Sequence, residues 1–376
     1  MDAIIAGIGQ TEFSKNSGRS RLQLAVEAAK AAISDAGLTP ADIDGSVSFT
    51  HDENDESAVL TNLGIPRLRF TSRTPGGGGG SCATIQHAAA AVVSGQASAV
   101  LVWRAFNERS ESRFGQPTQG ALDPAWSFHL PFGLDTPAKI YGLTFQRYMH
   151  RYGLTNADFG EYTVVARQYA ATNPNAWFYQ RPITIEDHQA SRWIVEPLLR
   201  LLDCCQESDG GVALVVTTAD RAPDLPRPAA RVAAASSAYL RGGHHLFNYH
   251  HADLSTFVEA AALADDLWAQ SGYGPSDMDV AMIYENFSPV VFMQLEALGF
   301  CGPGEARDLI AGGGIGPGGQ IPVNTNGGLL GEGYVHGMNN IVEGVRQLRG
   351  TAPNQVAGAQ RVLVSAGRSG LVLDRP

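Results

Sequence analysis

Two glycine-rich stretches of this 376-residue chain have the composition of loops that bind a reactive group. The first, PGGGGGS, ends at Ser81 and leads into an alanine-rich helical pattern, and the second, NTNGGLLGEGYVHGMNN, leads into IVEGVRQLRG. Glycine lets a backbone approach a ligand closely, and the first turn of a helix presents unpaired N–H groups at its positive end. Such amides can stabilise an oxyanion or a thioester enolate. A close packing turn between helix and sheet is the structural alternative for the first loop.

The cysteines and histidines follow no metal-site or redox pattern. Cys82, Cys204, Cys205 and Cys301 have neither metal-ligand spacing nor the spacing of a disulfide framework. The segment RGGHHLFNYHH holds four histidines, but adjacent histidines on a loop point apart, which favours pocket or surface lining over a metal cluster. We therefore predict no metal site. The chain has no GxGxxG with a downstream ribose-binding acid and no GxxxxGK[ST], which argues against nucleotide-dependent hydride or phosphoryl transfer.

Composition and charge narrow the functional class. A hydrophobic content of 44 % in a chain of this length is enough for a large buried core, so we expect a globular protein. The net charge of −10 and the pI near 5.4 argue against a nucleic-acid surface, which needs clustered lysine and arginine. The N-terminal stretch MDAIIAGIGQTEF has no cationic lead, and its apolar run is too short to span a membrane. We expect a cytoplasmic protein that binds no membrane.

Short apolar runs alternate with long alanine-rich helical patterns, as in AIIAGIG followed by LQLAVEAAKAAISDAG. This alternation is typical of βαβ units and predicts an α/β fold. The pattern repeats within the chain, because residues 27–47 resemble residues 264–283 and ASAVLVWRA resembles AQRVLVSAG. The repeat aligns Pro40, Asp42 and Asp44 with Pro275, Asp277 and Asp279. The chain is therefore predicted to consist of two homologous halves.

A proline-rich stretch at residues 222–230 marks the predicted boundary between the halves, because no regular element is easily sustained there. We place the first half at residues 1–225 and the second at residues 226–376. The first half contains a long insertion, about residues 107–200, which we predict to cover the substrate. Duplicated halves would bring both glycine loops to one pocket near the pseudo-twofold axis, with amide donors from both sides.

Several motifs resemble those of the thiolases, in particular the sterol-carrier-protein type, over nearly the whole chain. LLDCC (201–205) and SDG (208–210) resemble the central region of that family, and FSPVVFMQLEALGFCGPGE and VNTNGGLLGEG resemble its C-terminal half. The resemblance implies the thiolase fold, with five layers in the order αβαβα. It also implies two pseudo-equivalent halves and assembly as a homodimer.

The positions that carry thiolase chemistry differ in this sequence. The place of the nucleophilic cysteine falls near Gly78, and Cys82 lies about one helical turn later. The family's His-Asp-Cys-Phe is replaced by Tyr-Glu-Asn-Phe at residues 284–287, and the histidine of its Gly-His-Pro motif by Tyr334. The last Cys-x-Gly motif reads Ser365-Ala366-Gly367. Acyl transfer through a thiolase site needs an acceptor thiolate and a proton-moving partner, so this route is predicted to be lost.

The amides of the glycine loops and the two phenols, Tyr284 and Tyr334, fit a retro-aldol reaction, which needs no covalent acyl-enzyme. They resemble the lipid-transfer-protein-type aldolases of bacterial steroid side-chain degradation. This resemblance implies a steroid acyl-CoA substrate, a tertiary β-hydroxyacyl thioester that is cleaved to a ring ketone and propionyl-CoA. It also implies a partner protein with an OB-fold and a zinc ribbon, and a heterotetramer of the two proteins. Any zinc is expected in that partner, and this chain is expected to need no cofactor.

A retro-aldol reaction requires a base for the hydroxyl, stabilisation of the enolate and an acid for its α-carbon. The resemblance assigns the proton transfers to Tyr284 and Tyr334, with Tyr334 preferred as base and Tyr284 as acid. A phenol has a pKa of about 10, so a tyrosinate at neutral pH needs a positive or hydrogen-bonding neighbour. His336 and either His244 or His245 are candidates for that tuning.

Amide donors complete the predicted site. The oxyanion-binding and CoA-binding set comprises Gly78, Gly79, Gly80, Ser81, Gly333, Ser365 and Gly367. Tyr249, in the histidine-rich stretch, is a further catalytic candidate. Glu285 and Glu332 are interpreted as solvated or hydrogen-bonding groups outside the reacting set.

Two alternatives to the aldolase remain open at this point. The chain could be a β-ketoacyl-CoA thiolase that uses Cys82 as its nucleophile, in which case an acyl adduct on Cys82 would form. It could instead be a non-catalytic scaffold that binds acyl-CoA esters or lipids for a partner. A Tyr334→Phe protein with full turnover, or a native protein without turnover beside its partner, would favour the scaffold.

Overall fold

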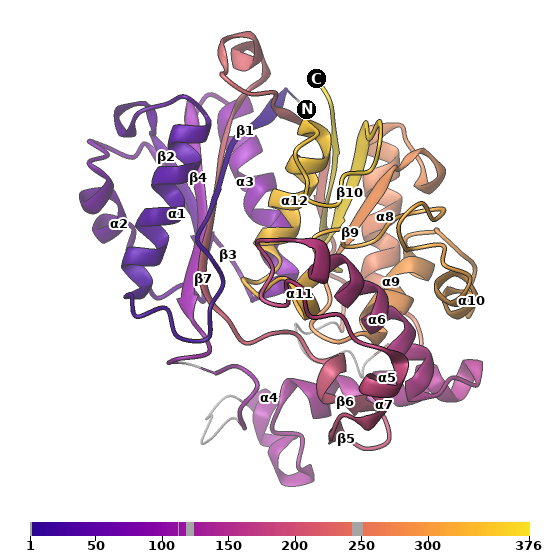
Figure 1. Cartoon of the computed structure of the whole chain (residues 1–376). Helices are drawn as coiled ribbons and strands as arrows, with labels where there is room; N and C mark the ends of the chain where they lie inside the picture. Colours follow the sequence, from indigo (N-terminus) through magenta and orange to yellow (C-terminus); the bar gives the residue numbers. More distant parts are fainter. Residues whose placement is uncertain (1, 112, 118–123, 243–250) are drawn as a thin grey trace.

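The strands of the molecule form a nine-stranded mixed sheet and a small two-stranded one (Figure 1). This computed structural model describes residues 2–111, 113–117, 124–242 and 251–376. The large sheet has the order β3-β2-β4-β7-β1-β8-β11-β10-β9, and the small sheet pairs β5 with β6. The strands are β1 (Ala3–Gln10), β2 (Gly45–Phe49), β3 (Phe70–Thr74), β4 (Ala99–Asn107), β5 (Trp193–Val195), β6 (Leu199–Arg200), β7 (Asp209–Thr218), β8 (Ala230–Ser237), β9 (Val280–Ile283), β10 (Arg361–Ser365) and β11 (Ser369–Asp374).

The helices and the two halves of the large sheet form the five predicted layers. Helices α3 and α12 lie between the half-sheets, because each contacts strands of both halves (Figure 1). Helix α1 covers the outer face of β1, β4 and β7, and α8 covers the outer face of β8 and β11. The helices are α1 (Arg21–Asp35), α2 (Glu56–Leu63), α3 (Ser81–Val93), α4 (Pro124–Ser127), α5 (Pro137–Tyr152), α6 (Asn156–Thr172), α7 (Ile185–Ala190), α8 (Val258–Ser271), α9 (Pro289–Ala297), α10 (Ala306–Ala311), α11 (Gly328–Gly331) and α12 (Met338–Arg349).

The internal duplication is visible in matching local structures. A short 3-10 turn precedes β2 at Pro40–Asp42, and another precedes β9 at Pro275–Asp277. In each half the next aspartate accepts two backbone N–H groups at the start of the neighbouring parallel strand: Asp44 from Ser98 and Ala99, and Asp279 from Gln360 and Arg361. The half-sheets meet where β1 pairs with β8 over a short stretch. The predicted two-half architecture is therefore confirmed.

The two central helices each begin at a glycine. Gly80 caps α3, and Gly337, with a φ of +77°, caps α12. An L-residue seldom adopts that φ, so the α12 start favours glycine. Both helices are apolar toward the half-sheets, and their buried side chains join the core between the sheets. The two helix N-termini thus lie where the sequence places the glycine loops.

The connection between β4 and β7 carries α4 to α7 and the small sheet, which lie together at one end of the molecule (Figure 1). The predicted limits of this insertion, and the division of the halves at residue 225, remain predictions. Among the residues described, no helix combines the length and the apolar character needed to cross a membrane.

Candidate active site

The ring of Tyr284 lies between the N-termini of the two central helices. Tyr284 follows β9 directly, and its N–H donates to the carbonyl of Ser365 at 2.7 Å. A Cβ added to Gly78 would lie 2.0 Å from Cε2 of Tyr284, and one added to Gly337 would lie 2.9 Å from its Cδ2. The phenol therefore fills the space that a side chain at residue 78, the expected place of a thiolase nucleophile, would occupy.

Tyr334 supplies a second phenol at the same point. Its hydroxyl oxygen lies 2.9 Å from that of Tyr284, and either hydroxyl can donate. The Tyr334 side chain is 7 % exposed, and its N–H donates to Oγ of Ser208 at 3.2 Å. The residue just before it, Gly333, is packed so closely that an added Cβ would lie 2.4 Å from the Phe13 ring. The structure thus brings together the two tyrosines that the sequence singled out.

Burial raises the pKa of both phenols well above the usual value. The hydrogen bond between them then acts in opposite directions, because it lowers the pKa of Tyr284 and raises that of Tyr334. Desolvation is the largest influence on both phenols, so their neighbours do not bring the pKa of either one down toward neutrality. Both groups are neutral phenols that can accept one proton only while giving up another.

His336 belongs to an aromatic and cationic cluster beside Tyr334. Its Nδ1 accepts a hydrogen bond from Nε of Arg104 at 3.1 Å, and Arg104 pairs with Asp52 at 2.8 Å in the protein interior. The ring of Phe114 stacks on His336 with a centroid distance of 5.3 Å. Sequence reasoning missed Arg104 and Asp52. The available signal was an arginine inside the otherwise apolar strand AVLVWRAF.

Two backbone N–H groups at the first glycine loop donate hydrogen bonds to carbonyls of the same loop. Gly78–Gly80 form a 3-10 turn in which the N–H of Gly80 donates to the carbonyl of Gly77 at 3.0 Å. The N–H of Ser81 donates to the carbonyl of Gly78. Of the four donors predicted in this loop, Gly78 and Gly79 therefore remain the candidates for holding an oxyanion. The carbonyl of Gly79 accepts a hydrogen bond from Ser369 Oγ at 2.7 Å, which ties the loop to β11.

Ser365 is linked to the Tyr284 backbone by hydrogen bonds within the second half. The Ser365 hydroxyl donates to Oε1 of Gln294 at 2.7 Å, and Nε2 of Gln294 donates to the carbonyl of Tyr284 at 2.7 Å. Gly367 has a φ of +82°, and an added Cβ would lie 2.7 Å from the Phe257 ring. Gln294, fully buried in α9, is a third residue that sequence reasoning missed. These contacts fix the backbone on both sides of the phenol.

Cys82 lies in the core between the half-sheets and not in the pocket. Its side chain has no exposed surface, and its Sγ donates to the carbonyl of Val364 at 3.6 Å. Burial raises the pKa of the Cys82 thiol to about 12. A thiol that is neither ionised nor accessible cannot attack a thioester. The alternative of a thiolase that uses Cys82 is therefore contradicted.

Cys82→Ala is expected to keep kcat within about twofold of the native value and to lower stability by roughly 1 to 2 kcal/mol through the small cavity it leaves. Steady-state turnover and thermal unfolding measure the two effects. In the native protein, intact mass after incubation with acyl-CoA should show no adduct on Cys82. A loss of turnover in a folded Cys82→Ala protein, or an acyl group on Cys82, would restore the thiolase interpretation.

The remaining predicted residues fall into two groups. Glu285 and Glu332 have no exposed surface, so the solvated interpretation is wrong and the hydrogen-bonding one holds. Oε1 of Glu285 accepts the N–H of Leu329 at 2.6 Å, and burial raises the pKa of Glu285 to about 8.

His244, His245 and Tyr249 lie outside the described residues. Within the described part of the chain, no cluster of three or more His, Cys, Asp or Glu side chains could hold a metal ion.

Comparisons with known proteins show the family to which the chain is related. The thiolase C-terminal domain-like family matches residues 243–373. A steroid side-chain-cleaving aldolase of Thermomonospora curvata is 54 % identical over 99 % of this chain and 97 % of its own length. A 17-hydroxy-3-oxo-4-pregnene-20-carboxyl-CoA lyase of Mycobacterium tuberculosis is 52 % identical over 99 % of this chain and 98 % of its own length. A solved structure described as an Ltp2-ChsH2(DUF35) aldolase is 53 % identical, with a TM-score of 0.95 over 100 % of this chain and 98 % of that one.

The fold and these matches define a protein of the thiolase fold. Within the thiolase superfamily, the chain belongs to the family of the steroid side-chain-cleaving aldolases.

Proposed function

We propose that this protein is a carbon–carbon lyase that cleaves a tertiary β-hydroxyacyl-CoA by a retro-aldol reaction. The observation that carries the proposal is the hydrogen-bonded pair of neutral phenols at the meeting point of two helix N-termini. Tyr284 fills the space beside Gly78, near which the resemblance places the thiolase nucleophile. The relatives named steroid side-chain-cleaving aldolase and 17-hydroxy-3-oxo-4-pregnene-20-carboxyl-CoA lyase support a steroid side chain as the group that is cut.

The two phenols can carry one proton from the substrate hydroxyl to its α-carbon without forming a tyrosinate. The hydroxyl gives its proton to Tyr334 while Tyr334 passes its own proton to Tyr284. The bond between the α- and β-carbons breaks, the β-carbon becomes a ketone, and the bond's electron pair forms the thioester enolate. In the same concerted step Tyr284 gives its own proton to the α-carbon as it takes the proton of Tyr334, so both phenols stay neutral. The hydrogen bond with Tyr334 offsets part of the effect of burial on the pKa of Tyr284, which favours Tyr284 as the final proton donor.

The enolate oxygen needs donors that are in place before the reaction. The Gly78 and Gly79 amides at the start of α3 are our candidates, and loss of one such donor typically costs about 3 to 4 kcal/mol of transition-state stabilisation.

The expected products are a ring ketone and propionyl-CoA. We further propose a homodimer that binds an OB-fold and zinc-ribbon partner as a heterotetramer. The similar solved structure, described as an Ltp2-ChsH2(DUF35) aldolase, has a second named component, and this supports a partner.

Product analysis tests the proposed function. The chain is incubated with a steroid tertiary β-hydroxyacyl-CoA in D₂O, with and without the partner, and the products are separated by mass. We expect the ring ketone and propionyl-CoA with one deuterium on its α-carbon. A β-ketoacyl-CoA with free CoA serves as control and should not be thiolysed. Absence of turnover beside the partner would support the scaffold alternative, and thiolysis without ketone formation would support a thiolase.

A further inference from the structure

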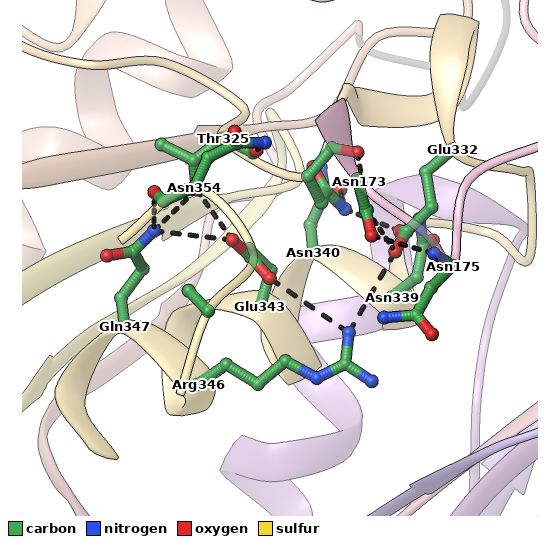
Figure 2. A network of polar contacts seen from close by, with 12 residues as sticks. Asn173, Asn175, Thr325, Glu332, Asn339, Asn340, Glu343, Arg346, Gln347 and Asn354 are labelled. Atoms are coloured by element: carbon green, nitrogen blue, oxygen red, sulfur yellow. Dashed lines mark hydrogen bonds and ion pairs between the residues drawn. The ribbon is translucent and has the colours of Figure 1, made fainter. Parts of the chain in front are cut away.

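A buried polar network, drawn in Figure 2, is not used by the proton relay. Its centre is Glu332, two residues before Tyr334, which has no exposed surface. The Glu332 carboxylate accepts hydrogen bonds from side-chain amides that belong to three separate segments: Asn173 at the end of α6 (3.4 Å), Asn326 before α11 (2.6 Å) and Asn339 on α12 (2.8 Å). Such a buried acceptor is satisfied only while all three segments keep their positions.

The same contacts restrain the backbone that carries Tyr334. The Glu332 carbonyl accepts the N–H of Trp177 at 2.8 Å. Nδ2 of Asn339 donates to Glu332 and also to the carbonyl of Gly333 at 3.2 Å. Both residues before Tyr334 are therefore held by buried hydrogen bonds, one of them from the long connection between β4 and β7.

The network also reaches Tyr284. Nδ2 of Asn326, which donates to Glu332, approaches Oδ1 of Asn340 at 3.4 Å. Nδ2 of Asn340 donates to the carbonyl of Ile283, the residue before Tyr284, at 3.3 Å. One carboxylate is thus linked to the backbone beside each phenol.

We propose that Glu332 is a positioning residue for the reaction: its carboxylate gathers amides from three segments and so keeps the Tyr334 hydroxyl within hydrogen-bonding reach of Tyr284. Glu332 acts through the backbone. The inference rests on the proposed retro-aldol function, because a relay across one 2.9 Å contact depends on the spacing of the two oxygens. A misplacement of about 1 Å in a reacting group can lower a rate by about 10²-fold.

Glu343 is a matched control for Glu332. Both carboxylates have no exposed surface, and both face Nη1 of Arg346, at 3.9 Å from Glu332 and 4.0 Å from Glu343 (Figure 2). The hydrogen bonds of Glu343 go instead to Thr325 (2.8 Å) and Gln347 (3.3 Å), away from the catalytic loop. In Glu343→Gln the amide N–H₂ can replace Oε2, which faces Arg346, so that Oε1 still accepts from Thr325 and Gln347. In Glu332→Gln either orientation sets the N–H₂ against other side-chain donors: against Asn173 and Arg346, or against Asn326 and Asn339.

The experiment compares Glu332→Gln and Glu343→Gln in the full chain with its partner, by steady-state kinetics and thermal unfolding. We expect similar losses of Tm in both variants. Glu332→Gln should lower kcat by roughly tenfold to a hundredfold with KM within about twofold, and Glu343→Gln should keep both constants within about twofold. Equal loss of kcat in both variants, native kcat in Glu332→Gln, or a loss confined to KM would overturn the proposal.

Hydrogen exchange separates this proposal from the proposed function. In Glu332→Gln, peptides covering residues 331–340 should exchange faster than in the native protein, whereas Glu343→Gln should leave them unchanged. This result can be read even if the native protein shows no aldolase turnover, which would refute the function alone. If Glu332→Gln does not fold, Asn339→Ala removes the donor shared by Glu332 and Gly333 and carries the same expectations. Unchanged exchange over these residues in the folded variant contradicts the positioning role.

Discussion

Tyr334→Phe is expected to lower kcat by about 10² to 10⁴-fold, the usual contribution of a positioned acid–base group. The ring and its contacts with Phe106 and His336 remain, so only the hydroxyl is lost. Tyr284 then has no phenol from which to receive a proton, and the substrate hydroxyl has no acceptor. Pre-steady-state and steady-state turnover of the tertiary β-hydroxyacyl-CoA measure the effect, with KM expected to change little because the lost step occurs after binding.

The relay also predicts that the effects of changing Tyr284 and Tyr334 are not additive. Because the two phenols move protons in one chain, Tyr284→Phe and the double variant should be about as slow as Tyr334→Phe, and their effects should not multiply. Circular dichroism and thermal unfolding serve as controls, since one buried hydroxyl left without its partner destabilises a protein by about 1 to 3 kcal/mol. A folded Tyr334→Phe protein that keeps more than about a tenth of native kcat would rule out the relay.

Gly78→Ala is expected to displace the Tyr284 ring and abolish most of the activity. The added methyl would lie 2.0 Å from Cε2 and 2.2 Å from Oη of Tyr284, far inside contact distance, so the phenol must move out of its slot. Overpacking of this kind typically destabilises a protein by about 1 to 3 kcal/mol. We expect a fall in Tm and a fall in kcat of about 10²-fold or more, because the phenol pair is broken.

Gly78→Cys extends the same prediction. A thiol at the thiolase position should not create a thiolase, since its Cβ meets Tyr284 in the same way and the pocket offers no thiolase partner groups. Gly79→Ala is the matched control for folding, because the nearest atom to its added Cβ is 3.8 Å away and its N–H is retained. An acyl-enzyme formed by Gly78→Cys, or a Gly78→Ala protein with native Tm and kcat, would show that Tyr284 does not occupy this space.

Local sequence was sufficient to predict the helix starts and strand junctions whose conformation depends on residues close by in the chain. The glycine run before Ser81 predicted the start of α3, and the aligned aspartates Asp44 and Asp279 predicted two equivalent strand junctions. These features rest on backbone conformation and on contacts within one βαβ unit, which residue type and spacing encode. The motif resemblance likewise indicated Tyr284 and Tyr334, whose hydroxyl oxygens lie 2.9 Å apart in the structure.

The environment of each side chain was decided by the tertiary structure. Cys82 and Gly78 lie within about one turn of each other in the chain, yet the first faces the core and the second faces the Tyr284 ring, 206 residues later in the sequence. The pKa of each phenol, the buried state of Glu332 and the pairing of Arg104 with Asp52 all depend on desolvation by residues from the other half or from distant loops. The sequence by itself determined the fold, the duplication and the residue types available for chemistry. Only the packing of segments that are distant in the chain decided which oxygens meet and how burial shifts their pKa, because burial and distance are properties of the folded chain.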